Sequence, residues 1–336
     1  MELTNPPRVV LLVGGVGGAK LSQGFYELYY GPQALWPREK AQDRLQIFVN
    51  VGDDWEWMGL KVCPDWDTNL YTLAQVNNKE QGWGLEGDTF KVLEALSQFP
   101  QAPTWFQMGD RDLALSLQRS AWLQEGLSLS QVARRLAELF QLVPCLHPAS
   151  DSPTPTWIDT ERGLLPFQEY LVRYKAKLRA YSFQYRQVEG ARPHPQLLEA
   201  LAQAQLLVIA PSNPLVSILP ILALPGVRDQ IEASAAHKVA VSPVVRNKAF
   251  KGPLLKMLHE AGRLPDATGV ARYYRPWLET FCLDPSDSDL EPALSASGLK
   301  TYWTSVDLKT LAQRRQLAFS ILTLPHPRSA TPCPAN

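Results

Sequence analysis

A glycine-rich turn near the start of the chain is the first feature whose residue types suggest chemistry. Gly14, Gly15, Gly17 and Gly18 follow a short β-branched run and precede a segment, Ala19–Tyr30, that can be helical. Glycines between a strand and a helix let backbone N–H groups approach a phosphate at the positive end of the helix. Lys20 adds a positive charge nearby. The pattern predicts phosphate binding, and the alternative is a tight turn with Lys20 in solvent.

The turn matches neither of the two standard nucleotide-binding fingerprints. A GxGxxG pattern that starts at Gly15 places Lys20 where the third glycine belongs, and a P-loop fails because Lys20 is not preceded by glycine. An NAD-binding oxidoreductase is disfavoured on a second ground. Its acidic residue would lie about 20 positions after the turn, whereas Asp53 lies 35 positions after Gly18.

Four aspartates form the second feature. Asp53 and Asp54 directly follow a predicted strand, and Asp65 and Asp67 come in the loop sequence CPDWDT. Ligands of open α/β sheets bind at the carboxyl ends of the strands, so these carboxylates would face the glycine turn. Carboxylates opposite a phosphate-binding turn are typical of Mg²⁺-assisted phosphoryl transfer. We expect at least one of Asp53 and Asp67 to belong to the metal or phosphate site.

Each aspartate also has a structural interpretation. Asp67 could cap a helix that runs to about Val76, because aspartate is a preferred N-cap residue. Asp65 could be a solvated loop residue. Adjacent side chains of an extended chain point to opposite sides, so only one of Asp53 and Asp54 is expected to face the site.

Two further polar turns could contact a ligand. Arg111, within the sequence GDRD, could clamp a phosphate or carboxylate, and the alternative is an N-cap aspartate at Asp110 with a surface ion pair. Ser212 and Asn213 lie between two prolines after a predicted strand, a rigid polar turn suited to a ribose, base or phosphate. A bare turn would have the same sequence.

Tryptophans crowd the acidic region. Trp55, Trp57, Trp66 and Trp83 could contact a flat aromatic ligand. Core packing or an interface is the more frequent explanation for such a cluster.

The elements that position these residues follow an α/β pattern. Apolar runs predict parallel strands at Arg8–Val13, Gln46–Asn50, Leu206–Ala210 and Lys238–Ser242. We predict a Rossmann-like, mostly parallel sheet with a helical insertion across about 70–145, in which Ser128 and Gln131 form a capping box. Residues 1–325 are expected to form one domain, followed by a flexible tail, 326–336. Three less distinct segments are also assigned: strands at Leu165–Lys177 and Arg179–Gln187, and a last helix at Leu308–Leu322 capped by Asp307.

Composition excludes several classes of protein. The chain has 336 residues with 33 basic and 33 acidic side chains, so bulk electrostatic binding of nucleic acid or anionic membrane is disfavoured. The four cysteines and five histidines form no zinc motif. The GxSxG motif, in which serine hydrolases place the nucleophilic serine on a sharp turn, does not occur either. The N-terminus lacks a basic region before its apolar run, and prolines break the longest apolar stretch, 214–227. We therefore expect a cytoplasmic protein.

Ten motifs in this order resemble one known family. They are VGGVGGAKL (13–21), NVGDD (50–54), GLKVCPDWDTNLYTLA (59–74), GWGLEGDTF (82–90), WFQMGDRDLA (105–114), LPFQEYLVR (165–173), APSNPLVSILPIL (210–222), VAVSPVV (239–245), KAFKGP (248–253) and GVARYY (269–274). Over about 8–285 the chain resembles the 2-phospho-L-lactate transferases of coenzyme F420 biosynthesis, called CofD or FbiA. Beyond 285 nothing is carried over.

The resemblance implies an Mg²⁺-dependent transferase with a Rossmann-like core, usually a homodimer. It would move a phospholactyl or phosphoenolpyruvyl group from a GMP-activated diphosphate to the deazaflavin Fo, releasing GMP. Asp53 and Asp67 would be the catalytic and metal-binding residues. The resemblance places the substrates against Gly14, Gly15, Gly17, Gly18, Lys20, Asp54, Asp65, Thr68, Trp83, Glu86, Asp88, Asp110, Arg111, Ser212 and Asn213.

A different class remains open. CofD-like regulators share the glycine turn and the NVGDD-type motif, bind ligands of the nucleotide-sugar type and have no known transfer reaction. The sequences CPDWDTNLYTLA, GDRDLA and LPFQEY favour the transferase branch. Neither the choice between the lactyl and enolpyruvyl donors nor the role of each aspartate follows from the residues.

Overall fold

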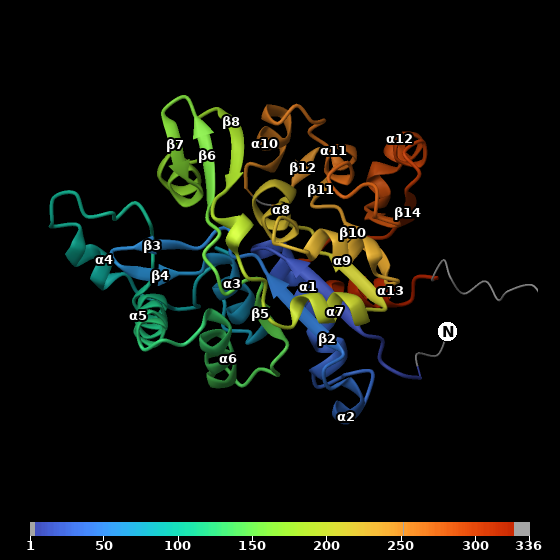
Figure 1. The fold of residues 1–336 in the computed structure, drawn as a ribbon, viewed down its shortest axis with the longest axis horizontal. Coiled ribbons are helices and arrows are strands. Elements are labelled where there is room, and N and C mark those ends of the chain that lie inside the picture. The colour runs from blue at the N-terminus through green and yellow to red at the C-terminus, as the bar shows by residue number, and fades with distance from the viewer. Residues whose placement is uncertain (1–3, 251, 326–336) are drawn as a thin grey trace, which may run out of the picture.

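A seven-stranded parallel sheet forms the centre of the protein (Figure 1). The computed structural model describes residues 4–250 and 252–325. All neighbouring strands of this sheet run parallel, which confirms the predicted α/β class. In spatial order the strands are β14 (Lys300–Trp303), β13 (Thr280–Leu283), β10 (His237–Val241), β9 (Leu206–Ile209), β1 (Val9–Val13), β2 (Leu45–Val49) and β5 (Leu146–Pro148).

The strand order creates a crevice beside β1. The chain passes from β1 to β2 and β5 on one side, then returns to β9 on the other side and continues outward to β14. A ligand crevice opens where a doubly wound sheet changes direction, at the carboxyl ends of the strands. Gly14 follows β1 and Ser212 follows β9, and the Gly14 N–H donates to Ser212 Oγ at 3.0 Å. The two predicted ligand-binding turns therefore meet at this crevice.

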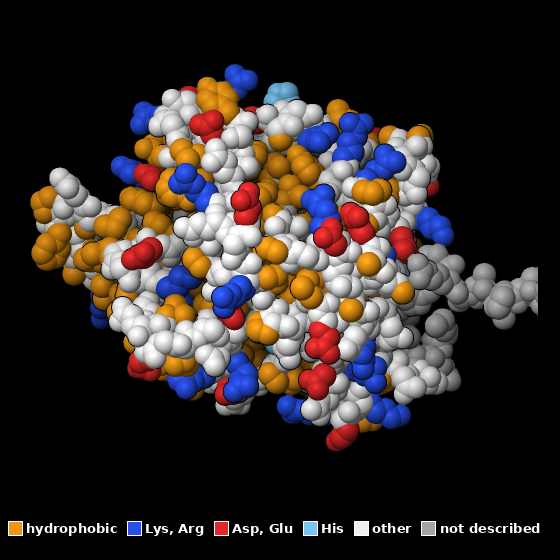
Figure 2. Space-filling model, in the orientation of Figure 1, with side chains coloured by type: hydrophobic (Ala, Val, Ile, Leu, Met, Phe, Trp, Pro, Cys, Tyr) orange, Lys and Arg blue, Asp and Glu red, His pale blue; other side chains and the backbone are white. Residues whose placement is uncertain are grey.

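A long insertion between β2 and β5 forms an arm. It contains a hairpin of β3 (Trp55–Trp57) and β4 (Leu60–Val62), followed by α3 (Pro64–Leu73), α4 (Lys91–Leu96), α5 (Asp110–Gln124) and α6 (Leu129–Leu139). Its outer part projects at the left of Figure 1, and Figure 2 shows hydrophobic side chains gathered there. Ser128 and Gln131 form the predicted capping box at the start of α6.

A small antiparallel sheet carries the segment that lies on the other side of the crevice, 167–175. It consists of β7 (Gly163–Pro166), β6 (Thr156–Thr160) and β8 (Ala180–Tyr185), in that order. The strand predicted at Leu165–Lys177 is wrong, because β7 ends at Pro166 and a π-helical turn, η1 (Glu169–Arg173), follows. The cause is the spacing of apolar residues. Phe167, Tyr170 and Leu171 pack into one cluster, a spacing that suits a helix and not a strand.

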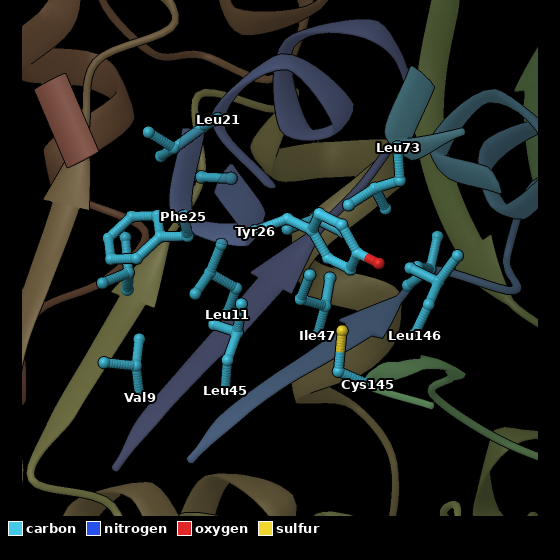
Figure 3. Packing of buried hydrophobic residues seen from close by; sticks show 14 of the residues in the cluster. Val9, Leu11, Leu21, Phe25, Tyr26, Leu45, Ile47, Leu73, Cys145 and Leu146 are labelled. Atoms are coloured by element: carbon cyan, nitrogen blue, oxygen red, sulfur yellow. The ribbon is translucent and has the colours of Figure 1, made fainter. Parts of the chain in front are cut away.

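Helices on both faces bury the central sheet. Alternate residues of β1 enter different cores: Val9 and Leu11 pack with Phe25 of α1 (Val16–Tyr30), and Val10 and Leu12 pack on the opposite face. Figure 3 shows the first of these cores, including Leu45 and Ile47 of β2. Strands buried on both faces have largely apolar sequences, which explains why β1, β9 and the apolar end of β10, Val239–Val241, were predictable.

Three predicted helix starts are corrected. The first helix begins at Val16, not at Ala19, so the later glycines of the turn belong to its first turn. The helix after the hairpin begins at Pro64 after the N-cap residue Cys63, so Asp67 is not its cap. Proline is favoured at the first helical position because its missing N–H would have no intrahelical partner there.

The third correction concerns α13 (Leu311–Leu322). Its N-cap is Thr310, which forms a capping box with Gln313, whereas Asp307 accepts an N–H from Lys309 four residues before the helix. A capping box satisfies two backbone N–H groups, which explains the later start.

The remaining elements complete the layers. They are α2 (Arg38–Ala41), η2 (Val188–Gly190), α7 (Leu197–Gln203), η3 (Pro214–Ile218), α8 (Leu219–Leu222), α9 (Val227–Ala233), β11 (Val244–Val245), β12 (Lys248–Ala249), α10 (Leu254–Glu260), α11 (Ala267–Ala271), η4 (Pro285–Leu290) and α12 (Glu291–Ser295). Within the described residues no helix has both the length and the apolar composition required to cross a bilayer. The predicted tail, 326–336, lies outside the described residues.

Candidate active site

A cavity of about 600 Å³ occupies the crevice at the carboxyl ends of β1 and β9. The main-sheet turns, the arm and the segment around η1, between β7 and β8, all contribute to its walls. Nine predicted site residues line it: Gly15, Gly17, Asp53, Asp65, Asp67, Thr68, Trp83, Ser212 and Asn213. The cavity therefore brings together the glycine turn, three of the four aspartates and the Ser-Asn turn.

The glycine turn allows close backbone approach. A Cβ on Gly17 would lie 2.2 Å from the carbonyl oxygen of Pro211, and a Cβ on Gly15 would lie 2.6 Å from Asp65 Oδ1. Neither glycine has a positive φ, so tight packing and not backbone strain requires them. No side chain caps α1, so its first N–H groups can bind an anion from the cavity.

Asn50 joins two of the aspartates. Its Nδ2 donates to Asp53 Oδ1 at 3.0 Å and to Asp65 Oδ2 at 2.9 Å, while its Oδ1 accepts the N–H of Gly52 at 2.8 Å. Neither carboxylate forms an ion pair with a basic side chain in the described part of the chain. Sequence reasoning missed Asn50 as a positioning residue, although it opens the motif NVGDD.

The electrostatics of this pair are unfavourable for two negative charges. Burial raises the pKa of Asp65 to about 7. Burial and, second, the charge of Asp65 raise the pKa of Asp53 well above its usual range. Two buried carboxylates without a cation are stabilised by a proton or a bound cation.

The other two aspartates have partners. Asp54 points away from the cavity and accepts from Lys61 Nζ at 3.0 Å and from Cys63 Sγ at 3.2 Å. This agrees with the expectation that only one of Asp53 and Asp54 faces the site. Asp67 lines the cavity, but both its oxygens bind the guanidinium of Arg119, one of them at 3.1 Å. Burial raises the pKa of Asp67, and Arg119 opposes that rise.

A second acidic group lies deeper in the arm. Tyr71 Oη donates to Asp112 Oδ1 at 2.6 Å, and both residues line the cavity. Burial raises the pKa of Asp112, while the bond from Tyr71 lowers it. Sequence reasoning missed Tyr71, because only the packing of α3 against α5 brings these two residues together.

Two predicted site aspartates cap helices. Asp88 accepts the N–H groups of Arg111 at 2.9 Å and Asp112 at 3.1 Å, at the start of α5. Asp110 accepts the N–H groups of Lys91 at 3.1 Å and Val92 at 3.0 Å, at the start of α4. Asp88 thus binds the first turn of α5, and Asp110 binds the first turn of α4. The capping alternative for the GDRD motif is wrong in its detail, because Gly109 is the N-cap of α5 and Asp110 binds a different helix, and Arg111 forms no ion pair among the described residues.

The remaining predicted residues lie outside the cavity lining. The Arg111 side chain donates to the backbone oxygen of Glu86 at 3.2 Å. Lys20 faces α13, and burial and, second, Arg314 lower its pKa. Lys175 is the one Lys or Arg among the described residues that line the cavity, and sequence reasoning missed it. The predicted residues that do not line the cavity are Gly14, Gly18, Lys20, Asp54, Glu86, Asp88, Asp110 and Arg111.

Aromatic side chains of the arm form one wall. Trp83, Trp105 and Phe106 line the cavity, and Trp55 packs behind them with its ring 5.3 Å from Trp105 and 4.7 Å from Phe106. Two of the other predicted tryptophans, at 57 and 66, belong to hydrophobic clusters, as the core-packing alternative expected. The wall offers flat apolar surface opposite the carboxylates.

Comparisons with known proteins assign the family. The model of the family described as "2-phospho-L-lactate transferase CofD" matches residues 9–291 of this chain. A protein of Mycobacterium leprae named phosphoenolpyruvate transferase is 38% identical over 287 residues, which cover 82% of this chain and 86% of that protein. A protein of the same name from Streptomyces coelicolor is 35% identical over 323 residues, 94% of this chain and 98% of its own length.

A solved structure shares the fold. The crystal structure of a upf0052 family member from Bacillus halodurans has a TM-score of 0.61 at 16% identity, and the match covers 95% of this chain and 99% of that one. The match along most of the sequence, together with the relatives above 30% identity, confirms the resemblance drawn from the ten motifs. This chain belongs to the 2-phospho-L-lactate transferase CofD family.

Proposed function

We propose that the protein transfers a phosphoenolpyruvyl group from a GMP-activated diphosphate to the deazaflavin Fo, a step of coenzyme F420 biosynthesis. The observation that carries this proposal is the arrangement of one cavity: an anion-binding turn, a pair of uncompensated carboxylates and an aromatic wall. Family membership supports the transferase reaction. The names of the two relatives favour the enolpyruvyl donor over the lactyl donor.

The residues present fit an Mg²⁺ ion. The Asp65 carboxylate touches the glycine turn, since a Cβ on Gly15 would lie 2.6 Å from Asp65 Oδ1. A phosphate bound at that turn would be repelled by Asp65 and Asp53 unless a cation lay between them. No group of three or more His, Cys, Asp or Glu residues suited to a metal occurs among the described residues. Mg²⁺ is commonly held by one or two carboxylates together with substrate phosphates and water.

This arrangement modifies the expected ligand set. We propose Asp53 and Asp65 as the Mg²⁺ ligands, because Arg119 occupies both oxygens of Asp67. Bound there, Mg²⁺ would neutralise charge on the phosphates during transfer. Asp67 and Arg119 would instead fix the wall beside Thr68, which follows Asp67 in α3.

The cavity offers a place for each part of the substrates. The N–H groups of the glycine turn, with Ser212 and Asn213, would bind the diphosphate and its guanosine. Trp105 and Phe106 would stack against the deazaflavin ring. Lys175 would attract the carboxylate of the enolpyruvyl group.

The transfer itself is a displacement at phosphorus. The terminal ribityl hydroxyl oxygen of Fo forms a bond to the phosphorus that carries the enolpyruvyl group. The bond between this phosphorus and the bridging oxygen of the diphosphate breaks. GMP leaves with that oxygen, and the hydroxyl proton is released. Positioning and electrostatic stabilisation supply most of the acceleration in such reactions, so the chain's main task is to align the two substrates and exclude water. We also propose a homodimer, on the resemblance alone.

A direct assay tests the proposal. The purified protein is incubated with Fo, Mg²⁺ and either enolpyruvyl-diphosphoguanosine or lactyl-diphosphoguanosine. The products are separated by chromatography and identified by mass spectrometry. We expect GMP and dehydro-F420-0, with slower reaction of the lactyl donor. Absence of Fo binding, with saturable binding of a nucleotide sugar, would assign the chain to the regulatory CofD-like proteins instead.

A further inference from the structure

A second cavity, of about 460 Å³, lies where α10 ends and beside α11 and α12. Three of its lining side chains are arginines: Arg263, Arg272 and Arg275. It shares no lining residue with the first cavity. Figure 2 shows basic side chains grouped over this region, at the upper right of the view. The other lining residues are Leu264, Thr268, Ala271, Pro276, Ala293, Leu294 and Ser297.

The charge of this second cavity is not balanced. No Asp or Glu is among its lining residues, and none of the three arginines forms an ion pair within the part of the chain that the structure describes. The whole chain carries a net charge of zero, so the positive charge is a local concentration. Guanidinium groups around one hollow repel each other, and an anion in the hollow removes that repulsion.

The lining combines guanidinium groups with apolar surface. Arg263 lies over the ring of Tyr273, 5.4 Å from its centroid, which restricts the guanidinium. Guanidinium groups bind phosphate through paired N–H donors, more selectively than lysine does. Leu264 is 50% exposed at this hollow, and the exposed side chains of Pro276 and Ala293 add further apolar surface. A ligand with both a phosphate and an apolar part would satisfy both kinds of surface.

We propose that this second cavity binds a small molecule that carries a phosphate group and an apolar body. The site is separate from the transfer reaction and does not depend on it. One short helix connects the two cavities in sequence, since α10 begins at Leu254, which lines the first cavity, and ends three residues before Arg263, which lines the second. A helix of seven residues spans roughly 10 Å, so the two sites lie at opposite ends of one short helix.

Calorimetric titration of the full-length protein with 1-naphthyl phosphate tests the proposal. The first cavity is also expected to bind phosphate, so the result is read from the difference between variants. The variant R272Q/R275Q removes two exposed guanidinium groups, and R228Q removes an exposed guanidinium of α9 outside both cavities. In R272Q/R275Q we expect 1-naphthyl phosphate to lose its binding at the second cavity, or to bind there at least about tenfold more weakly for each guanidinium removed. R228Q should bind it as the wild type does.

The controls keep the result decisive. Thermal unfolding must show that each variant is folded, and R263Q replaces the double variant if that protein fails to fold. Inorganic phosphate serves as a second probe and should bind more weakly than 1-naphthyl phosphate at this site. Equal binding of 1-naphthyl phosphate by the wild type, R228Q and R272Q/R275Q would overturn the proposal. Equal binding of the two probes would overturn the apolar part of it.

Discussion

Replacing Arg119 with methionine tests whether the Asp67–Arg119 pair is structural. The exposed fractions of the two side chains are 1% for Arg119 and 7% for Asp67. Removing one partner of a buried pair costs about 3–5 kcal/mol. At about 2.1 cal/mol/K per residue, the unfolding entropy of 336 residues is about 0.7 kcal/mol/K, so the melting temperature should fall by about 4–7 °C.

The pH dependence of this loss gives a sharper test. Without Arg119, burial and the charges of Asp112 and Asp54 act unopposed on Asp67, so the pKa of its carboxyl in the folded state rises further above the unfolded value of about 3.9. A group whose folded pKa is raised adds stability at low pH, and that stability is lost as the pH rises toward the folded pKa. The loss is about 1.4 kcal/mol per pH unit. R119M should therefore be more strongly destabilised at pH 8 than at pH 6.

A double variant isolates the carboxyl group. D67N/R119M carries no charge at either position, so it should lack the extra pH dependence and recover part of the lost stability. Urea unfolding at pH 6, 7 and 8 of R119M, D67N/R119M and the wild type measures both effects. Equal free energies of unfolding for R119M and the wild type, or equal pH slopes for R119M and the double variant, would refute the reasoning.

Three further predictions concern the first cavity. G15A adds a Cβ 2.6 Å from Asp65 Oδ1, so it should weaken GDP binding in the presence of Mg²⁺ while its circular dichroism spectrum stays native; unchanged GDP affinity would contradict the close approach. D53N should reduce transfer by orders of magnitude, whereas D54N should retain most of the activity and lose stability, because Asp54 pairs with Lys61 outside the cavity; equal rates for the two variants would remove the distinction. W105A should weaken Fo binding, measured by fluorescence, by about tenfold, and W105F should restore much of it; an unaffected W105A would exclude the aromatic wall as the ring site.

The sheet and its ligand edge could be predicted because they depend on local sequence. The strands β1 and β9 are continuous apolar runs, and β10 ends in the apolar run Val239–Val241, as strands buried on both faces require. The turn after β1 and the turn after β9 then had to meet, because parallel strands bring their carboxyl ends to one edge. Gly15, Asp53 and Ser212 were found in this way.

The partners of the charged residues could not be predicted, because they come from distant elements. Asp67 lies 52 residues from Arg119, and only the packing of α5 on β4, the strand before α3, brings them together. The aspartates at 88 and 110 have residue types that suit both ligand binding and helix capping, and the sequence does not show which helix end each one meets. Trp105 lies in a loop of the arm, where no periodic pattern indicates the direction of a side chain.

The distinction between Asp65 and Asp67 could not be made from spacing either. Both lie in the first turn of α3 and both are buried. One contacts Asn50 and the glycine turn, while the other contacts a buried arginine. The difference is one of neighbours across the fold.

Mn²⁺ binding in the presence of GDP, followed by electron paramagnetic resonance, tests the central claim most directly, because Mn²⁺ replaces Mg²⁺ in most oxygen-ligand sites. The wild type and D54N should bind Mn²⁺ with similar affinity, and D53N and D65N should bind it at least about tenfold more weakly. The account predicts that D67N, if folded, keeps most of the Mn²⁺ affinity, because Arg119 and not the cation holds that carboxylate. Full Mn²⁺ binding by D65N together with its loss in D67N would contradict the account.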